Sequence, residues 1–204
     1  MRIDPSQLAQ ESQWARQARQ GDEQAFARLV EVFQVPVYNL CFRMLGEAGE
    51  AEDAAQEAFL KAYRGLHRYD PERRFGSWCL SVTAHECIDR LRRRRMAALD
   101  LDAIEGEAAL TDVAPGPESV VMRREQAARV AQLLDRLSPL DRAIITLKYW
   151  YDMPLEEIAA DLDLTTSAVK SRLHRSRREL AQLYVEASSP TTIRGETSDV
   201  PLPV

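Results

Sequence analysis

Side chains that can bind another molecule are concentrated near the C-terminal end of the sequence. Between residues 167 and 178, hydroxyl, imidazole, ammonium and guanidinium groups recur at helical spacing, at Ser167, Lys170, Ser171, His174, Arg175 and Arg178. This spacing places them on one face of a helix. Hydroxyl and ammonium groups can hydrogen-bond to the edges of bases, and guanidinium groups neutralise phosphates. The pattern therefore predicts a helix that binds nucleic acid.

Two short helices joined by a tight turn must hold this face in place. The apolar face expected for the first helix consists of Leu155, Ile158, Ala159 and Leu162. Asp163 stands at the turn, and aspartate tolerates a left-handed backbone better than most residues other than glycine. Thr165 is suited to cap the second helix, whose expected apolar positions are Val169, Leu173, Ser176 and Leu180. The segment 154–183 thus predicts a helix-turn-helix, whose second helix lies in the major groove of duplex DNA.

A second candidate surface combines aromatic rings with arginines. Tyr69 precedes the polar loop 70–77, Phe75 lies within it and Trp78 follows it, and the next helix ends in four consecutive arginines, 92–95. Rings that stack on unpaired bases, next to cations that neutralise phosphates, are typical of single-strand binding. An alternative stays open at this point, because Phe75 and Trp78 are equally suited to anchor a hydrophobic core.

Two further helices are each predicted to carry a polar face. On the helix after residue 75, one side presents Ser81, His85, Asp89 and Arg92. On the helix before residue 66, one side presents Asp53, Gln56, Glu57, Leu60 and Arg64. Either face could be an ordinary solvated surface with charge pairs four residues apart. His85 and Cys87 point in different directions on a helix and cannot share a metal ion, so we expect no metal and no cofactor.

The distribution of charge divides the chain into four parts. The net charge of the whole chain is −5, but residues 100–119 contain six carboxylates, no basic residue and a Pro-Gly-Pro sequence. This composition predicts a flexible linker. We therefore expect an all-α protein of two small helical domains, 20–98 and 120–186, joined by an acidic flexible linker, 99–119. The C-terminal domain carries the helix-turn-helix, and the polar tail 187–204 is expected to be disordered.

The remaining composition narrows the class of protein. Cys41, Cys79 and Cys87 lack a CxxC spacing, and no signal peptide or run of about 20 apolar residues is present. We expect reduced thiols, a cytoplasmic location and no direct insertion into a membrane. The sequence contains no glycine-rich phosphate loop, HExxH or GxSxG motif, and its carboxylates are scattered over helix faces. Catalysis by this chain is not expected.

Three stretches together resemble the extracytoplasmic-function group of bacterial sigma-70 factors. They are DAAQEAFLKAYRGLHRY, FGSWCLSVTAHECIDRLRRRR and LSPLDRAIITLKYWYDMPLEEIAADLDLTTSAVKSRLHRSRREL. In that family they occur in this order and are separated by a linker. The resemblance covers most of residues 20–184 and implies a subunit that binds core RNA polymerase, recognises −35 and melts −10 promoter elements.

The resemblance also implies which residues perform each task. The −35 element is read by Thr165, Thr166, Ser167, Lys170, Ser171, His174, Arg175 and Arg178. The −10 element is bound, with one base flipped out, by Tyr69, Phe75, Trp78, Ser81, His85, Asp89 and Arg92. Core RNA polymerase is bound by Asp53, Gln56, Glu57, Leu60 and Arg64. The acidic linker is similar to the segment that runs toward the RNA channel of the polymerase.

The sequence departs from the family pattern at three positions. Asn is common where His85 stands, Gly where Asp163 stands, and Thr where Ala168 stands. The promoter sequence therefore cannot be copied from relatives. The resemblance further implies an anti-sigma partner, and we expect a monomer.

Two other classes of protein remain to be weighed. An operator-binding helix-turn-helix regulator would bind duplex DNA tightly without polymerase and would not need Phe75, Trp78 or the four arginines. A helical interaction protein that sequesters a regulator would tolerate the loss of Lys170 and Arg175. An enzyme acting on nucleic acid is the least favoured, because no nucleophile, base and metal constellation is visible.

Overall fold

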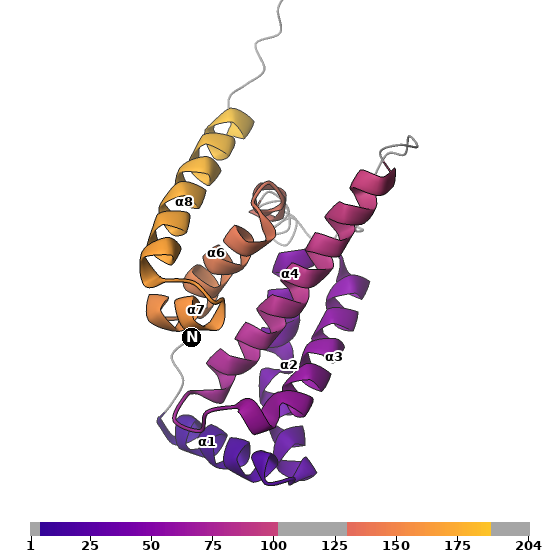
Figure 1. The fold of residues 1–204 in the computed structure, drawn as a ribbon, viewed down its shortest axis with the longest axis vertical. Coiled ribbons are helices and arrows are strands. Elements are labelled where there is room, and N and C mark those ends of the chain that lie inside the picture. The colour runs from indigo at the N-terminus through magenta and orange to yellow at the C-terminus, as the bar shows by residue number, and fades with distance from the viewer. Residues whose placement is uncertain (1–4, 102–129, 189–204) are drawn as a thin grey trace, which may run out of the picture.

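The computed structural model describes residues 5–101 and 130–188, and within these ranges the regular structure is entirely helical (Figure 1). The helices are α1 (Pro5–Arg19), α2 (Glu23–Leu45), α3 (Ala48–Gly65), the 3-10 helix η1 (Leu66–Arg68), α4 (Phe75–Leu101), α6 (Pro139–Tyr151), α7 (Leu155–Asp161) and α8 (Thr166–Ser188). Residues 130–135, ahead of α6, are also helical. The predicted all-α fold is confirmed, whereas the acidic linker from residue 102 and the tail from residue 189 lie outside the described residues.

The N-terminal helices begin and end at residues suited to those positions. The Asp22 side chain accepts a hydrogen bond from the Ala25 N–H at 3.0 Å, and Gly46 ends α2 with a left-handed backbone at φ 84°. Glycine adopts this conformation without the clash that a side chain would cause. Pro36 lies inside α2, and the helix nevertheless continues through it to Leu45.

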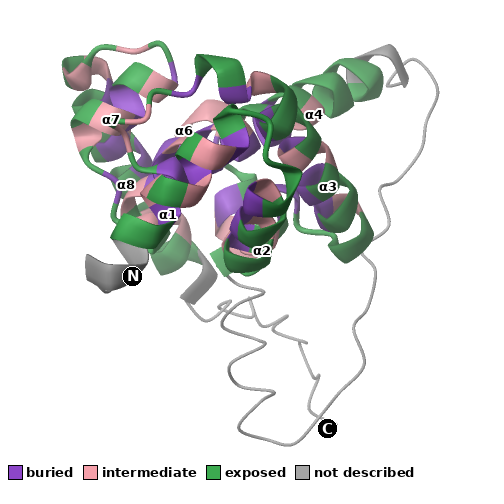
Figure 2. Ribbon diagram, turned by 90° about the horizontal axis from the view of Figure 1, so that it is seen from below, coloured by how far each residue is buried: buried purple, intermediate pink, exposed green. Residues whose placement is uncertain are grey.

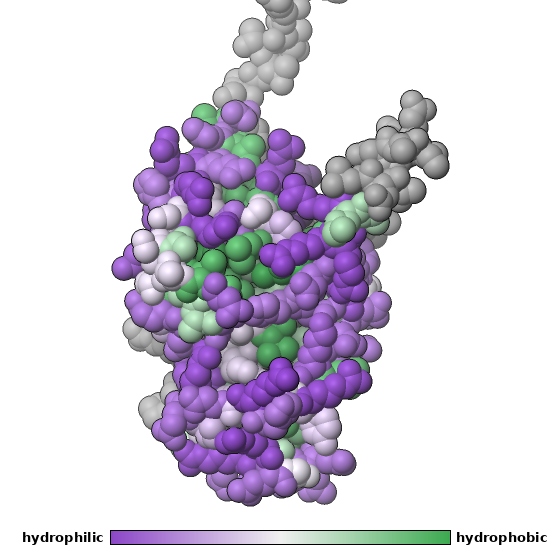
Figure 3. All heavy atoms as spheres, viewed as in Figure 1, coloured by the Kyte–Doolittle hydropathy of each residue, from purple (hydrophilic) through white to green (hydrophobic). Residues whose placement is uncertain are grey.

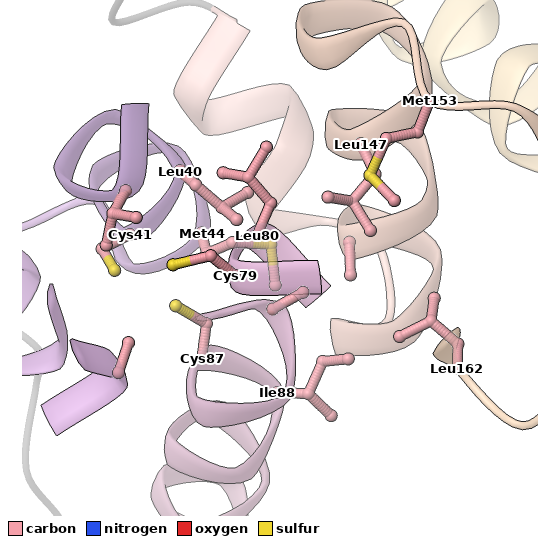
Figure 4. Close-up of a cluster of buried hydrophobic side chains, with 14 of the residues drawn as sticks. Leu40, Cys41, Met44, Cys79, Leu80, Cys87, Ile88, Leu147, Met153 and Leu162 are labelled. Atoms are coloured by element: carbon pink, nitrogen blue, oxygen red, sulfur yellow. The ribbon is translucent and has the colours of Figure 1, made fainter. Parts of the chain in front are cut away.

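Apolar faces of α2, α3 and α4 meet in the core of the N-terminal unit. Cys41, Cys79 and Cys87 are all buried there and unbridged, among leucine, methionine and isoleucine side chains (Figure 4). Burial raises the pKa of Cys79 to about 12. The contact with Cys41, followed by burial, raises the pKa of Cys87. Thiols protonated at neutral pH react slowly, so Cys79 and Cys87 act as small core residues.

The helix-turn-helix forms as its sequence predicts. Ser138 caps α6 by accepting from the Asp141 N–H at 3.2 Å, and Thr165 caps α8 by accepting from the Ala168 N–H at 3.1 Å. Asp163 stands in the turn between α7 and α8 with φ 54°, in the left-handed region. The apolar positions named above are buried or half-buried on one side of each helix.

Trp150 departs from the helical periodicity of α6. The periodicity of α6 places Trp150 with the core residues Ile144, Ile145 and Leu147, yet Trp150 is 37% exposed. Its ring instead lies under the guanidinium group of Arg43, 5.4 Å from the ring centroid. A cation over an indole face is favourable, and it draws the ring to the boundary between the two units.

The two units pack against each other along α2, α4, α6 and α7 (Figures 1 and 2). Their buried apolar residues form one cluster that extends from α1 to α8. The hydrogen bonds that cross the boundary include those from the Arg142 guanidinium to the Arg43 carbonyl at 2.8 Å and from the Tyr151 hydroxyl to the Pro36 carbonyl at 2.6 Å. Arg73, in the loop between η1 and α4, also pairs with Asp161 of α7 at 2.6 Å. The two helical domains therefore share an extensive interface in this structure.

Candidate nucleic-acid interface

The polar face of α8 is open to solvent. Of the eight residues predicted to read DNA here, Thr166 is half-buried and the other seven are exposed: Thr165, Ser167, Lys170, Ser171, His174, Arg175 and Arg178. The opposite side of α8 packs on α6 and α7, where Val169 and Ser176 are buried. The helix is thus held by its apolar side, and its hydrogen-bonding groups remain available to a ligand.

The predicted polar face of α4 is only partly open. His85, Asp89 and Arg92 are exposed, but Ser81 is buried. The His85 imidazole Nδ1 lies 3.0 Å from the Ser81 carbonyl oxygen, one turn back along the helix. This contact orients the ring, and Nδ1 acts as the donor because a carbonyl oxygen can only accept.

The three aromatic residues of this region form a cluster, and two of them are core residues. Tyr69 and Phe75 are 1% and 0% exposed, with ring centroids 5.7 Å apart. Trp78 packs on both rings and is half-buried. The core-anchor alternative therefore holds for Phe75 and extends to Tyr69, because a fully buried ring offers no face to an unpaired base. Among the three, only Trp78 keeps exposed surface for stacking.

The buried tyrosine also fixes the loop before α4. The Tyr69 hydroxyl donates to the Arg73 carbonyl at 2.5 Å, which closes the polar loop between η1 and α4. Burial is the main cause that raises the pKa of Tyr69 to about 12, with Glu11 and Asp70 adding to the shift. The hydroxyl consequently stays protonated and keeps its role as a donor throughout the physiological range.

A buried glutamate that the sequence analysis did not single out holds the start of α4. Glu11 of α1 is 5% exposed, and its Oε1 accepts from the Gly76 N–H at 2.7 Å. Burial is the largest cause acting on the Glu11 pKa and raises it, against the Gly76 hydrogen bond. A Cβ at Gly76 would lie 2.6 Å from the Phe33 ring, so only glycine fits there. No spacing rule links positions 65 residues apart.

The arginines at the end of α4 are exposed, and one of them takes part in a tertiary ion pair. Arg92, Arg93, Arg94 and Arg95 all lie at the surface, and Arg94 contacts Glu50 of α3 at 3.0 Å. Beneath them Glu86 is buried and accepts from both Lys61 and Arg90 at 2.5 Å. Burial alone would raise the pKa of Glu86, but these two cations outweigh it and lower the pKa.

The polar face of α3 contains one apolar side chain among charged ones. Four of its residues are exposed, namely Asp53, Gln56, Leu60 and Arg64, and Glu57 is half-buried. The exposed fraction of Leu60 is 49%. In Figure 1, α3 and α8 lie on opposite sides of the molecule. The predicted polymerase-binding and −35-reading faces are therefore separate surfaces.

Other kinds of site were sought in residues 5–101 and 130–188. No group of three histidine, cysteine or carboxylate side chains in this part of the chain could hold a metal ion. Nor is any helix described there long and apolar enough to cross a membrane.

A helical bundle with a basic helix end, followed by a helix-turn-helix, defines a class of multidomain DNA-binding proteins. Residues 29–96 match Sigma-70 region 2, and residues 127–180 match Sigma-70, region 4. The chain is 37% identical to the ECF RNA polymerase sigma factor SigW of Bacillus subtilis over 172 residues, which is 81% of this chain and 91% of that protein. The chain belongs to the extracytoplasmic-function group of the sigma-70 family, and it is a promoter-directing sigma factor.

Other relatives agree with this family. The ECF RNA polymerase sigma-E factor of Escherichia coli is 32% identical over 169 residues, covering 79% of this chain and 87% of that protein. Among solved structures, CnrH in complex with the cytosolic domain of CnrY has a TM-score of 0.63 and 26% identity, covering 88% of this chain and 99% of that one. The sigma factor RpoE of Bartonella quintana, solved with the anti-sigma factor NepR, has a TM-score of 0.61 at 19% identity and shares the fold.

Proposed function

We propose that α8 reads the −35 element while α4 and the loop before it bind the −10 element, and that the polar face of α3 docks on core RNA polymerase. The observation that carries this assignment is the exposed polar face of α8, whose opposite side is buried against α6 and α7. Recognition needs a rigid helix with free hydrogen-bonding groups, and this element combines both.

Individual side chains of α8 divide into two tasks. Ser167, Lys170 and Ser171 lie in its first two turns, nearest the groove floor in a helix-turn-helix, and contact base edges. Arg175 and Arg178 lie further along and neutralise phosphates, with His174 between the two groups. Thr165 and Thr166 at the helix start place backbone N–H groups and hydroxyls near the phosphate chain.

The −10 segment combines buried side chains that hold it rigid with a few exposed side chains that can contact DNA. Tyr69 and Phe75 fix the loop from within the core, while Trp78, His85 and Asp89 contact the single strand and Arg92 its phosphates. Flipping a base out of the duplex costs a few kcal/mol, which stacking and hydrogen bonds must offset. Stacking on one aromatic side chain contributes about 1–3 kcal/mol, so Trp78 supplies a large part of that.

The chain acts as a non-enzymatic subunit in the cytoplasm. RNA synthesis is carried out by core polymerase, which meets the chain at Asp53, Gln56, Glu57, Leu60 and Arg64. An exposed leucine ringed by polar groups is a suitable centre for a protein contact. A monomer kept inactive by an anti-sigma partner completes the proposal, and the similarity to CnrH, solved with the cytosolic domain of CnrY, supports it.

In vitro transcription tests the proposal. The full chain is added to sigma-free core polymerase on fragmented genomic DNA of the source organism, and the 5′ ends of the transcripts are sequenced. Discrete starts preceded by a shared two-part element are expected. If the polymerase makes no transcripts while the chain alone binds duplex DNA tightly, the result would instead favour an operator-binding regulator.

A further inference from the structure

The first helix of the chain, α1, lies beside the loop proposed to bind the −10 element. It packs across the end of α2 and contacts both η1 and α4, the two elements that this loop joins (Figure 1). The match to Sigma-70 region 2 begins at residue 29, so α1 precedes the matched segment. A helix outside that segment therefore touches the region proposed to bind DNA.

The inward side of α1 contains a carboxylate among small apolar side chains. Glu11, Ala15 and Ala18 are buried at helical spacing, and Trp14 is half-buried beside them. Burial of a carboxylate costs free energy unless hydrogen bonds or opposite charges offset it. An alanine at position 11 would avoid that cost, so packing alone does not account for a glutamate there. Departures of this kind from the rules of core packing occur mainly at functional sites.

The outward side of α1 is an ordinary polar surface. Its exposed residues include Gln10, Gln13, Arg16 and Arg19. In Figure 3, the lower end of the molecule, where Figure 1 places α1, is mainly hydrophilic on the face shown. Polar side chains at a solvated surface need no partner. The contact that sets α1 apart is therefore the inward one made by Glu11.

Glu11 supplies a helix cap that α4 lacks in its own sequence. The residue immediately before α4 is Arg74, whose guanidinium group can donate hydrogen bonds but cannot accept them. The first N–H groups of a helix have no acceptor within the helix. Oε1 of Glu11 accepts from the Gly76 N–H at 2.7 Å, and a hydrogen bond from the Phe75 backbone also acts on this carboxylate. The cap thus comes from another helix.

Gly76 brings the backbone of α4 close enough for this contact. A Cβ at Gly76 would lie 2.6 Å from the Phe33 ring and 3.5 Å from Oε1 of Glu11, so the backbone passes closely between α2 and α1. The Phe33 ring also packs on Phe75, with centroids 5.7 Å apart. The first turn of α4 is therefore fixed relative to both helices.

This turn carries the ring that is proposed to stack on DNA. Trp78 lies two residues after Gly76, and its backbone N–H donates to the Arg74 carbonyl at 3.2 Å. The loop before the turn is closed separately by the hydrogen bond from the Tyr69 hydroxyl to the Arg73 carbonyl. A movement of the first turn would displace the Trp78 ring, and errors of about 1 Å in the position of a functional group can cost about 100-fold in activity.

We propose that α1 is part of the −10-binding site and that Glu11 is a positioning residue, which fixes the first turn of α4 so that Trp78 meets the flipped base. The inference rests on the proposed function of α4, and it adds a residue that is itself buried and touches no DNA. A segment ordered in advance loses less conformational entropy when the strand binds, which strengthens binding.

Two binding measurements on the holoenzyme test this role. The full chain is combined with sigma-free core polymerase, and fluorescence anisotropy measures binding of a single-stranded −10 oligonucleotide and of a duplex −35 fragment, both taken from a promoter found by transcript sequencing. Glu11→Ala should weaken oligonucleotide binding about ten-fold, as expected for a lost hydrogen bond to a charged group, and leave −35 binding unchanged. Equal oligonucleotide affinities in wild type and variant would overturn the proposal.

Two conservative variants separate the reach of the side chain from its charge. Glu11→Asp keeps the charge but withdraws the carboxylate by one methylene group, so it should weaken oligonucleotide binding. Glu11→Gln keeps an oxygen acceptor at the original reach and should bind like the wild type. The opposite order would overturn the assignment, because charge would then matter more than the contact with Gly76. Both variants keep a polar group at the buried site, so the comparison remains valid if the alanine variant does not fold.

Glu47→Ala is the matched control. Glu47 caps α3 by accepting from the Gly49 and Glu50 N–H groups at 2.8 and 2.6 Å, at the end of α3 remote from the −10 loop (Figure 1). The same substitution should leave oligonucleotide binding unchanged, and an equal loss in both alanine variants would reduce Glu11 to a general stabiliser. A wild-type holoenzyme that binds neither element would remove the proposed function and this inference together, whereas normal wild-type binding with unaffected Glu11 variants removes only the positioning role.

Discussion

The two elements proposed to read DNA differ in how the rest of the chain restrains them. On α8, seven of the eight residues proposed to read the −35 element are exposed. The −10 segment is restrained on several sides, by Glu11 at the start of α4, by the Tyr69 hydroxyl within the loop and by Asp161 of the other unit. A helix that binds duplex DNA needs only an exposed face, whereas a segment that must hold a base flipped out of the duplex needs a rigid pocket.

A substitution at Gly76 is expected to have the largest effect, and it tests how rigidly the start of α4 is held. Gly76→Ala would place a methyl group 2.6 Å from the Phe33 ring, and such overpacking typically costs about 1–3 kcal/mol. The urea midpoint of unfolding should fall accordingly. Gly65→Ala is the control, because its Cβ would meet Trp78 at an ordinary 3.6 Å. Equal stability of the two variants would mean that α4 starts less rigidly than described.

Lys170 tests the exposed polar face of α8. Lys170→Ala should weaken use of the −35 element by about 1–3 kcal/mol, as expected for a base contact, while thermal stability stays within about 0.5 kcal/mol of the wild type. Footprinting of the holoenzyme and a melting curve measure the two quantities. Arg136→Ala removes one positive charge at an exposed site of the same unit and should leave promoter use unchanged. A loss of stability in Lys170→Ala would show that α8 is not a freely presented face.

The contribution of Glu11, which holds the start of α4 through Gly76, depends on pH. Since the pKa of Glu11 is raised in the folded state, the folded protein releases this proton at higher pH than the unfolded chain does. The stability that this proton contributes is present at pH below the unfolded value of 4.5 and decreases as pH rises through the folded pKa. Glu11→Gln keeps an oxygen acceptor for Gly76. The difference in urea midpoint between wild type and variant should therefore change over this window, and a constant difference would contradict the assignment.

Arg92 gives the smallest expected effect and compares the two elements directly. It is exposed on α4, so Arg92→Ala should behave like an α8 variant, with unchanged stability. Loss of one phosphate contact reduces the salt dependence of promoter binding by about one in slope. Titration of holoenzyme binding against salt concentration measures this slope. An unchanged slope would place Arg92 outside the DNA contact.

Much of the architecture follows from local sequence rules. Ser138 and Thr165 cap their helices, and Asp163 turns the chain because short polar side chains serve backbone groups nearby. The helical spacing of residues 167–178 correctly separates the exposed side of α8 from its buried side. These features depend on neighbours within a few residues, which is why the order of residues alone predicts them.

Burial of the aromatic cluster depended on distant parts of the chain. Tyr69 and Phe75 have the composition of a stacking surface, but helices α1 and α2 enclose them, and a periodic pattern cannot identify what covers a face. Trp150 is the opposite case. Its helical spacing from the apolar residues of α6 indicates a core position, but the contact with Arg43 of α2 holds it at the surface.

The sequence by itself determined the helix-turn-helix, its caps and the family, because each of these is recorded in contiguous stretches. It did not show α1, which lies ahead of the domain predicted to begin at residue 20. Only the tertiary structure decided that Glu11 meets Gly76, that Arg73 meets Asp161 and that the two helical units pack against each other. Those contacts join residues 65 and 88 positions apart, and their free energy depends on desolvation by surrounding helices. No local pattern encodes that environment, so it emerges only when the helices have packed.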